Sequence, residues 1–253
     1  MNCLCLLCFV CCSMAAAAES PRIVGGQEVT IELVPYLVNL RHRDVFICGG
    51  SLITSSCVLS AAHCVHGAQA QDFSVHAGAS RLNENAPIVR DVNTFYVAPN
   101  YNPTNFDMDV AILRLSTPAT RLPGQVTSIV PCSLPPPSNA YVRISGWGVT
   151  SEENRLPPSQ VRTANVRVLP TRECQLAYAG LAKISDSMFC AAIRGVKDSC
   201  SGDSGGPVVY RGQVCGIVSW GFGCARAAFP GVYTSVASPR VQHFIQQTMQ
   251  DYC

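Results

Sequence analysis

Residues 197–209 read KDSCSGDSGGPVV, and this stretch decides how the fold of the whole chain is interpreted. Three glycines surround Ser204, and because glycine is costly in regular structure they predict a tight backbone turn. Two aspartates, Asp198 and Asp203, accompany that serine. In isolation, a surface loop rich in Gly, Ser and Asp explains the stretch equally well, since short motifs often arise by chance. The rest of the sequence must therefore decide between a specific tight turn around Ser204 and an ordinary surface loop.

Length and charge narrow the class of protein. The chain has 253 residues, 48% of them hydrophobic and 13% charged, with a formal net charge of +2. This length suits one compact all-β or α/β unit with a sizeable core. A near-neutral chain without a basic, aromatic-rich cluster offers no electrostatic basis for binding nucleic acid.

The first twenty residues, MNCLCLLCFVCCSMAAAAES, form an apolar run followed by small residues. This pattern predicts a secretory signal peptide over residues 1–18, with an A-x-A cleavage site near Ala18. No Lys or Arg precedes the run, and a signal anchor is the alternative, but the run is short for a membrane span. No later stretch is apolar enough to span a membrane. We therefore expect a secreted, extracellular protein without membrane contact after signal cleavage.

Cysteine usage supports the same compartment. Of the 15 cysteines, five lie in the apolar start and ten are spread through the rest of the chain. A secreted chain folds in an oxidising compartment, where such cysteines form disulfides. Zinc is the competing interpretation, but none of the ten shows C-x-x-C spacing and the histidines are scattered. We expect no metal and no cofactor.

Short runs rich in β-branched and aromatic residues, broken by Gly, Pro, Asn and Ser, make up most of the chain after the signal. Without alternating helices, such runs favour an antiparallel barrel or sandwich. The Pro-rich stretch 121–139 indicates an extended connector. It predicts a boundary between two halves near residues 118–137.

The C-terminus is the exception to the strand pattern. Ser238 is a candidate N-cap, and Pro239 suits the first helical position. The apolar residues that follow have helical spacing: Val241, Phe244, Ile245 and Met249. One amphipathic helix is predicted at the end of the chain.

Three segments together answer the question raised by the opening stretch: LSAAHC with His63, DVAILRL with Asp109 and GDSGGP with Ser204. Taken singly, each residue has an ordinary structural explanation. Together, in this order and in a secreted β-rich chain, they resemble the chymotrypsin/trypsin-like serine peptidase family, from IVGG at residue 23 to the C-terminal helix. The resemblance implies a domain over residues 23–253: an all-β fold of two antiparallel six-stranded β-barrels packed together, with a C-terminal α-helix.

The resemblance also implies a mechanism. A serine hydroxyl is a poor nucleophile at neutral pH and needs an adjacent base. Ser204 would attack the scissile carbonyl while His63 accepts its proton, and Asp109 would orient and stabilise the imidazole. The N–H groups of Gly202 and Ser204 match the family's oxyanion hole. Asp107 also lies nearby, but DVAILRL aligns Asp109 with the family's carboxylate.

Asp198, six residues before Ser204, matches the floor of the family's specificity pocket. A carboxylate at that position selects Arg or Lys, because an unpaired buried charge is costly. Several further residues match substrate-binding positions of the family: Ser199 at the pocket base, Gly221 and Gly231 in its walls, Ser219 and Trp220 beside the substrate backbone, and Phe106 at the neighbouring subsite.

RIVGG assigns a role to Asp203. In the family, cleavage before Ile frees an α-ammonium that pairs with this carboxylate. Here the cut would fall between Arg22 and Ile23, which leaves residues 19–22 as a short activation propeptide without an acidic run. The family's precursor-stabilising His before CGGS is replaced by Phe46 or Ile47, and its calcium-loop glutamate by Ala79.

The cysteines follow the family only in part. Three pairs match family bridges: Cys48–Cys64, Cys174–Cys190 and Cys200–Cys224. A fourth family bridge is absent, with Val142 and Tyr210 in its positions. Cys57, Cys132, Cys215 and Cys253 are unusual for the family and allow three pairings. We favour Cys132–Cys215 with Cys57–Cys253.

The leading hypothesis is a secreted, monomeric serine endopeptidase, made as a zymogen, that cleaves proteins or peptides after Arg or Lys and is controlled by protein inhibitors. The main alternative is a non-catalytic serine protease homologue that acts as a binding protein. Such homologues usually lose a member of the triad, whereas this chain keeps all three. An inert disulfide-rich structural protein would need neither the triad, the pocket aspartate nor the activation site.

Overall fold

We describe the protein from a computed structural model that covers residues 24–149, 151 and 159–253. The predicted signal peptide and the predicted cut between Arg22 and Ile23 lie outside these residues. No helix in the described part of the chain is long and apolar enough to cross a membrane.

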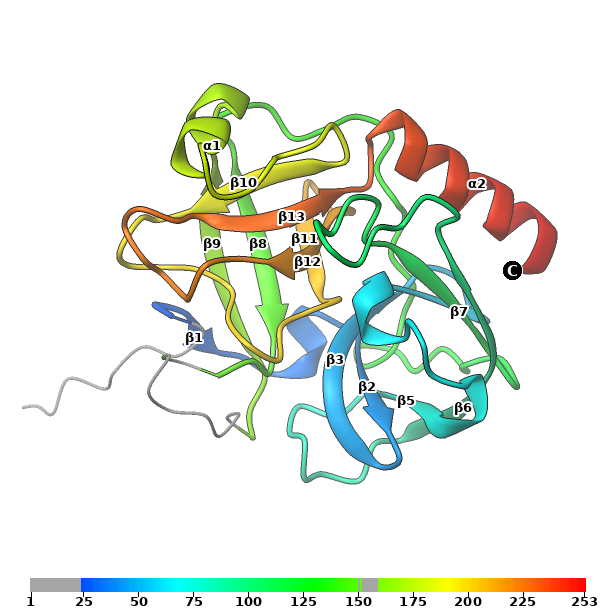
Figure 1. The fold of residues 1–253 in the computed structure, drawn as a ribbon. Coiled ribbons are helices and arrows are strands. Elements are labelled where there is room, and N and C mark those ends of the chain that lie inside the picture. The colour runs from blue at the N-terminus through cyan, green and yellow to red at the C-terminus, as the bar shows by residue number, and fades with distance from the viewer. Residues whose placement is uncertain (1–23, 150, 152–158) are drawn as a thin grey trace, which may run out of the picture.

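The first half of the chain forms a closed antiparallel barrel with the strand order β2-β3-β4-β7-β6-β5 (Figure 1). Its strands are β2 (Leu37–His42), β3 (Val45–Leu52), β4 (Cys57–Ser60), β5 (Phe73–Ala77), β6 (Ile88–Val97) and β7 (Ala111–Leu115). Alternate side chains point inward, as in β5, where Phe73, Val75 and Ala77 are buried and the residues between them are half-buried. This period of two is what a strand with one face on the core requires.

The second half forms another antiparallel barrel, which closes because β8 pairs with both β11 and β9. Its strands are β8 (Tyr141–Gly146), β9 (Arg162–Val168), β10 (Met188–Ala192), β11 (Pro207–Tyr210), β12 (Gln213–Trp220) and β13 (Gly231–Ser235). The short strand β1 (Gln27–Glu28) adds to β9 from outside. The prediction of two six-stranded barrels is confirmed.

In the described part of the chain two α-helices accompany the barrels: α1 (Thr171–Ala177) and α2 (Pro239–Tyr252). Among the described residues there are also three short 3-10 helices: η1 (Ile31–Leu33), η2 (Ala62–Cys64) and η3 (Ala70–Asp72). The chain passes from one barrel to the other between β7 and β8, and α2 then returns to pack on the first barrel (Figure 1).

The predicted C-terminal helix is confirmed, but its predicted cap is not formed. Val241 and Ile245 are buried in the core of the first barrel, and Phe244 and Met249 pack against it. Ser238 stands at the N-cap position with extended backbone, yet its side chain makes no capping hydrogen bond. Its hydroxyl is instead buried without a partner in the described part of the chain. Packing of the apolar face, with Pro239 at the first helical position, is therefore sufficient to start the helix.

Five disulfides join described cysteines: Cys48–Cys64, Cys57–Cys253, Cys132–Cys215, Cys174–Cys190 and Cys200–Cys224. These are the three pairs that the resemblance implied and the two that were favoured for the remaining cysteines. Cys57–Cys253 links β4 to the residue that ends α2, across 196 positions of sequence. Val142 and Tyr210 pack together in the second barrel, where the fourth family bridge is absent.

Candidate active site

His63 and Asp109 are held together by two hydrogen bonds at the mouth of the first barrel. His63 lies in η2, directly after β4, and Asp109 comes just before β7. The backbone N–H of His63 donates to Asp109 Oδ1 at 2.9 Å, and its Nδ1 lies 2.8 Å from Oδ2. Asp109 is fully buried, whereas the His63 side chain keeps 23% of its surface exposed. The imidazole is thus anchored from behind, with its other face open to solvent.

The second barrel completes the environment of Asp109. The Ser219 hydroxyl donates to Asp109 Oδ2 at 2.5 Å, and the Thr234 hydroxyl donates to the Asp109 carbonyl at 2.9 Å. These two contacts hold Asp109 in place from the second barrel. Sequence reasoning assigned Ser219 to the substrate backbone and did not anticipate that its side chain supports Asp109.

Ser204 lies in the turn between Cys200 and β11, which both barrels hold in position. Its carbonyl accepts a hydrogen bond from Gly49 N–H in the first barrel, with a 2.8 Å separation between nitrogen and oxygen. The next residue, Gly205, donates from its backbone to the Val218 carbonyl in the second barrel, also at 2.8 Å. Ser204 therefore lies at the junction of the barrels, where it lines a cavity together with Asp198.

Gly202 has a φ of 93°, a backbone conformation that only glycine adopts readily. A Cβ at this position would also come within 3.1 Å of the Gly148 backbone. Neither the N–H of Gly202 nor that of Ser204 donates a hydrogen bond to any residue that the structure describes. Two unpaired N–H groups in one turn are suited to receive a negatively charged oxygen.

The cavity beside Ser204 has a volume of about 240 Å³, and Asp198 lies in its lining. Its lining includes six of the residues named from the sequence: Asp198, Ser199, Ser219, Trp220, Gly221 and Gly231. A Cβ on Gly231 would approach Asp198 Oδ1 to 2.4 Å, so glycine is needed to leave the carboxylate accessible. The cavity therefore has an accessible carboxylate in its lining.

Asp198 is 1% exposed and accepts hydrogen bonds from Ser199 N–H at 2.9 Å, Ala225 N–H at 3.2 Å and the Tyr233 hydroxyl at 3.3 Å. Burial raises the pKa of Asp198 to about 7, although these hydrogen bonds oppose the shift. No cationic side chain pairs with this carboxylate in the described part of the chain. The arrangement favours a cationic ligand that would stabilise the charged form.

Tyr233 is a member of this site that sequence reasoning missed. It is fully buried in β13, two residues after Gly231, and its hydroxyl also lies 3.1 Å from Ser199 Oγ. The signal was available, because residues two apart in a strand face the same side. Assigning Gly231 and Tyr233 to the same strand would have been enough to place Tyr233 at this site.

Phe106 borders the same region on the side of His63. Its ring meets the imidazole edge-on, with 5.8 Å between ring centroids, and stacks toward Trp220 at 6.4 Å. Behind Trp220 lies a further aromatic group formed by Tyr178, Phe222 and Phe229. Phe106 therefore separates the imidazole from an aromatic wall.

Asp203 does not line the cavity and is buried against Gly146 and Gly148 of the second barrel. It is 2% exposed, and its two oxygens accept from Gly148 N–H at 2.8 Å and Cys200 N–H at 3.0 Å. Burial raises the pKa of Asp203 to about 6. Val24, the first described residue, accepts a hydrogen bond at its carbonyl from Asp198 N–H at 3.3 Å. The start of the described chain thus lies against the pocket.

The described residues contain one group of potential metal ligands, Cys48, His63 and Cys64, whose ligand atoms lie within 4.8 Å of one another. The two sulfurs are joined in a disulfide and do not offer thiolates.

Comparison with known proteins agrees with this geometry. The sequence profile of the Trypsin family matches residues 23–245. Seminase of Drosophila melanogaster is 42% identical, over 87% of this chain and 79% of its own length. Trypsin of Xenopus laevis is 40% identical, over 88% of this chain and 89% of its own. The solved structure of neuropsin, a serine protease expressed in the limbic system of mouse brain, superimposes with a TM-score of 0.80 at 33% identity, covering 88% of this chain and 98% of neuropsin.

Two barrels with a histidine, a buried aspartate and a serine at their junction define a serine endopeptidase of the chymotrypsin/trypsin-like kind. The chain belongs to the trypsin family. It is a trypsin-like serine endopeptidase, a hydrolase of peptide bonds.

Proposed function

We propose that this protein is a secreted endopeptidase that hydrolyses peptide bonds after Arg or Lys through a triad of Ser204, His63 and Asp109. The observation that carries the specificity is Asp198, a buried carboxylate in the lining of the same cavity as Ser204. A guanidinium or ammonium group in that cavity would replace the lost hydration of the carboxylate. Uncharged side chains would leave the charge unpaired.

The proposed reaction begins when Ser204 Oγ attacks the carbonyl carbon and His63 Nε2 takes its proton. The hydrogen bond from His63 Nδ1 to Asp109 keeps Nε2 free as the proton acceptor and stabilises the imidazolium. The Gly202 and Ser204 N–H groups would stabilise the oxyanion. His63 then protonates the leaving amine, and water hydrolyses the acyl-enzyme by the same route.

The test of this proposal is a peptide library that varies the residue before the cleaved bond, applied to protein that begins at Ile23. We expect cleavage after Arg and Lys and covalent labelling of Ser204 by a fluorophosphonate. A non-catalytic binding protein would neither label nor cleave. Labelling with cleavage after apolar residues would retain the enzyme but reject the role of Asp198.

Binding of a small cation should depend on pH, because burial raises the pKa of Asp198 to about 7. Only the ionised carboxylate pairs with a cation, so the affinity for benzamidine should fall by up to about tenfold per pH unit below pH 7. Burial holds the pKa of Tyr233 well above 10, so this neighbour stays neutral. Calorimetric titration from pH 5.5 to 8 measures the effect. Asp198→Asn should bind weakly with little pH dependence, and a flat wild-type profile would contradict the assignment.

We further propose that cleavage between Arg22 and Ile23 activates the enzyme. The new α-ammonium at Ile23 would pair with Asp203, which has two neutral N–H partners and no cationic one among the described residues. This carboxylate belongs to the same turn as Gly202, so the pairing would fix the backbone that forms the oxyanion hole. The contact of Val24 with Asp198 supports docking of this end of the chain beside the pocket.

Arg22→Gln should leave the precursor inactive, since the enzyme can no longer be cut at this bond. Wild-type precursor should activate itself, because Arg22 is a residue after which the enzyme is expected to cleave. Turnover of an Arg-containing substrate, followed over time for both precursors, measures the difference. Protein that begins at Ile23 is the positive control. Full activity of the Arg22→Gln precursor with its N-terminus still extended would reject the mechanism.

The domain organisation is part of the same proposal. Residues 1–18 would direct secretion and be removed, residues 19–22 would form the activation propeptide, and residues 23–253 would form the peptidase domain. Partners would be protein or peptide substrates and protein inhibitors that present Arg or Lys to the cavity. The active protein would be a monomer.

A further inference from the structure

The turn that leads to Asp109 has an unfavourable backbone on both sides of Asp107. Phe106 and Met108 each have a φ of 58°, a region that bulky residues rarely occupy. The Phe106 ring contacts His63, and Asp109 holds the same imidazole from behind. Strained backbone of this kind persists when its surroundings hold it in place, and it often marks a functional site.

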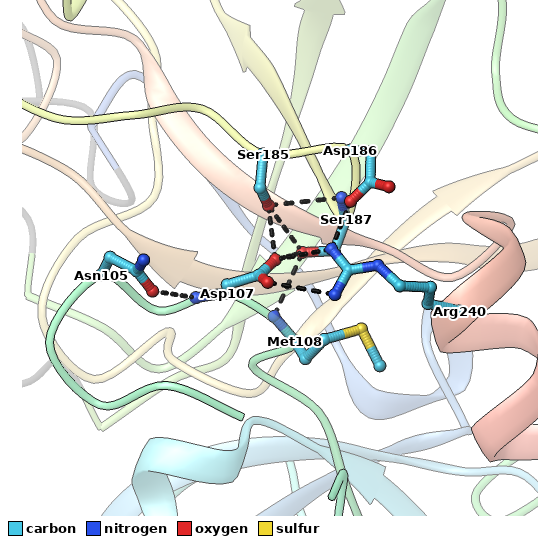
Figure 2. Close-up of polar contacts among 7 residues, drawn as sticks. All are labelled: Asn105, Asp107, Met108, Ser185, Asp186, Ser187 and Arg240. Carbon is cyan, nitrogen blue, oxygen red and sulfur yellow. Dashed lines mark hydrogen bonds and ion pairs between the residues drawn. The ribbon is translucent and has the colours of Figure 1, made fainter. Parts of the chain in front are cut away.

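Asp107 is the residue through which the turn is held (Figure 2). Its Oδ1 accepts hydrogen bonds from Ser185 Oγ at 2.6 Å, Ser187 Oγ at 2.7 Å and the Arg240 guanidinium at 3.0 Å. Its Oδ2 accepts a second bond from Arg240 at 3.1 Å. Arg240 also pairs with Asp186. Bidentate pairing between arginine and a carboxylate fixes geometry as well as energy.

The partners of Asp107 come from elsewhere in the fold. Ser185 and Ser187 directly precede β10 in the second barrel, and Arg240 lies in the first turn of α2. Ser187 is fully buried, and its Oγ also accepts a hydrogen bond from the Met108 N–H at 3.1 Å. The network therefore holds both the Asp107 side chain and the strained backbone beside it. It ties the turn of the first barrel to the second barrel and to the helix.

These contacts keep the Asp107 carboxyl group ionised. Burial alone would raise its pKa, but the hydrogen bonds from Arg240, Ser185 and Ser187 outweigh burial and lower the pKa of Asp107 to about 2. Asp107 therefore stays ionised wherever the enzyme is expected to work. It does not contact the cavity or His63 in the described structure, so it would act through its neighbours.

We propose that Asp107 is a positioning residue that sets the Phe106 ring and the Asp109 carboxylate around His63, and that it thereby restricts the substrate side chain just before the cleaved Arg or Lys. The inference rests on the proposed function. A substrate residue beside His63 meets the edge of the Phe106 ring, so a firmly held ring excludes bulky side chains. If the turn relaxes, this exclusion weakens and the alignment of Asp109 with His63 deteriorates.

The experiment compares Asp107→Ala, Arg240→Gln and Glu173→Gln in protein that begins at Ile23. Glu173→Gln is the matched control, because it breaks an Arg–carboxylate pair of the same 3.0 Å length between Arg194 and α1. Active enzyme is counted by fluorophosphonate titration. Then kcat and KM are measured on Arg substrates whose preceding residue is Gly, Ala, Leu or Phe.

For Asp107→Ala we expect the preference for small over bulky preceding residues to fall roughly fivefold. We also expect kcat per active site to fall roughly tenfold, since misalignment of about 1 Å can have large effects. Arg240→Gln should change both quantities in the same direction but by less, because the serine hydroxyls still hold Asp107. Glu173→Gln should change neither.

A double-mutant cycle with Phe106→Ala isolates the route of the effect. Phe106→Ala alone should remove the preference for small preceding residues, and adding Asp107→Ala should change it no further. An unchanged preference in Asp107→Ala overturns the inference, even if the variant melts at lower temperature. If Asp107→Ala does not fold, an unchanged preference in Arg240→Gln decides against it in the same way. Wild-type protein that fails to label would instead reject the proposed function.

Discussion

Replacement of Ser204 by Ala should lower kcat on an Arg substrate by roughly 10⁴-fold or more, the scale known for serine peptidases that lose their nucleophile. The reason is that alanine has no hydroxyl to attack the scissile carbonyl, so the proposed nucleophile is lost. The cavity and Asp198 remain, so KM should change little. Single-turnover and steady-state assays, on protein quantified by absorbance, measure the loss.

The control for this prediction is the double variant Ser204→Ala/His63→Ala. If the two side chains act as one unit, His63→Ala alone should be about as damaging, and the pair hardly worse than either single change. If the fold-losses in kcat of the two single variants multiply in the double variant, Ser204 and His63 act independently. That result would contradict their proposed roles as nucleophile and base. Benzamidine binding that persists in Ser204→Ala would show that the cavity is intact.

Asp198→Ser should reduce kcat/KM for Arg and Lys substrates by roughly 10⁴-fold, because the carboxylate that pairs with the substrate cation is removed. Cleavage after uncharged residues should change much less, since His63, Asp109 and the Gly202 N–H lie outside the cavity floor. The same peptide library measures both changes. A variant that still strongly prefers Arg would show that Asp198 does not face the substrate.

Stability provides the control for folding of Asp198→Ser. Burial raises the pKa of Asp198 above its unfolded value of about 4. The contribution of protonated Asp198 to the free energy of unfolding is therefore fully present below about pH 4. This contribution is lost as pH rises through the folded pKa of about 7. Serine has no such charge, so the variant should melt at a higher temperature than wild-type at pH 8, with a smaller difference at pH 4. A variant that melts lower at pH 8 would contradict the burial argument.

Much of this protein could be predicted from short stretches of its sequence. The turn around Ser204, the segments of His63 and Asp109, and Pro239 at the start of α2 are local patterns, and local patterns carry the signals of strand, turn and helix. The two-barrel fold was reached through resemblance to a family. Strand patterns alone left a barrel and a sandwich equally open.

Contacts between distant residues were harder to predict. Asp107 and Arg240 are 133 positions apart, and Ser219 and Asp109 are 110 apart, so no spacing rule relates them. For Ser238 the error was the opposite, because the sequence predicted a side-chain contact that does not form. Its sequence position was right for a cap, but burial at the junction of β13 and α2 kept its side chain from the helix N–H groups.

The disulfide between Cys57 and Cys253 determines what happens to the protein when its chain is cut by a protease. The proposed cleavage after Arg or Lys would expose the 18 Lys and Arg residues of the chain to cuts by its own copies. The bridge encloses residues 58–252, so one cut within that interval leaves both fragments covalently attached. The nicked and intact molecules then have almost the same mass until they are reduced. Under the proposed specificity, cleaved molecules would keep α2 attached to the first barrel and would be distinguished from intact ones only after reduction.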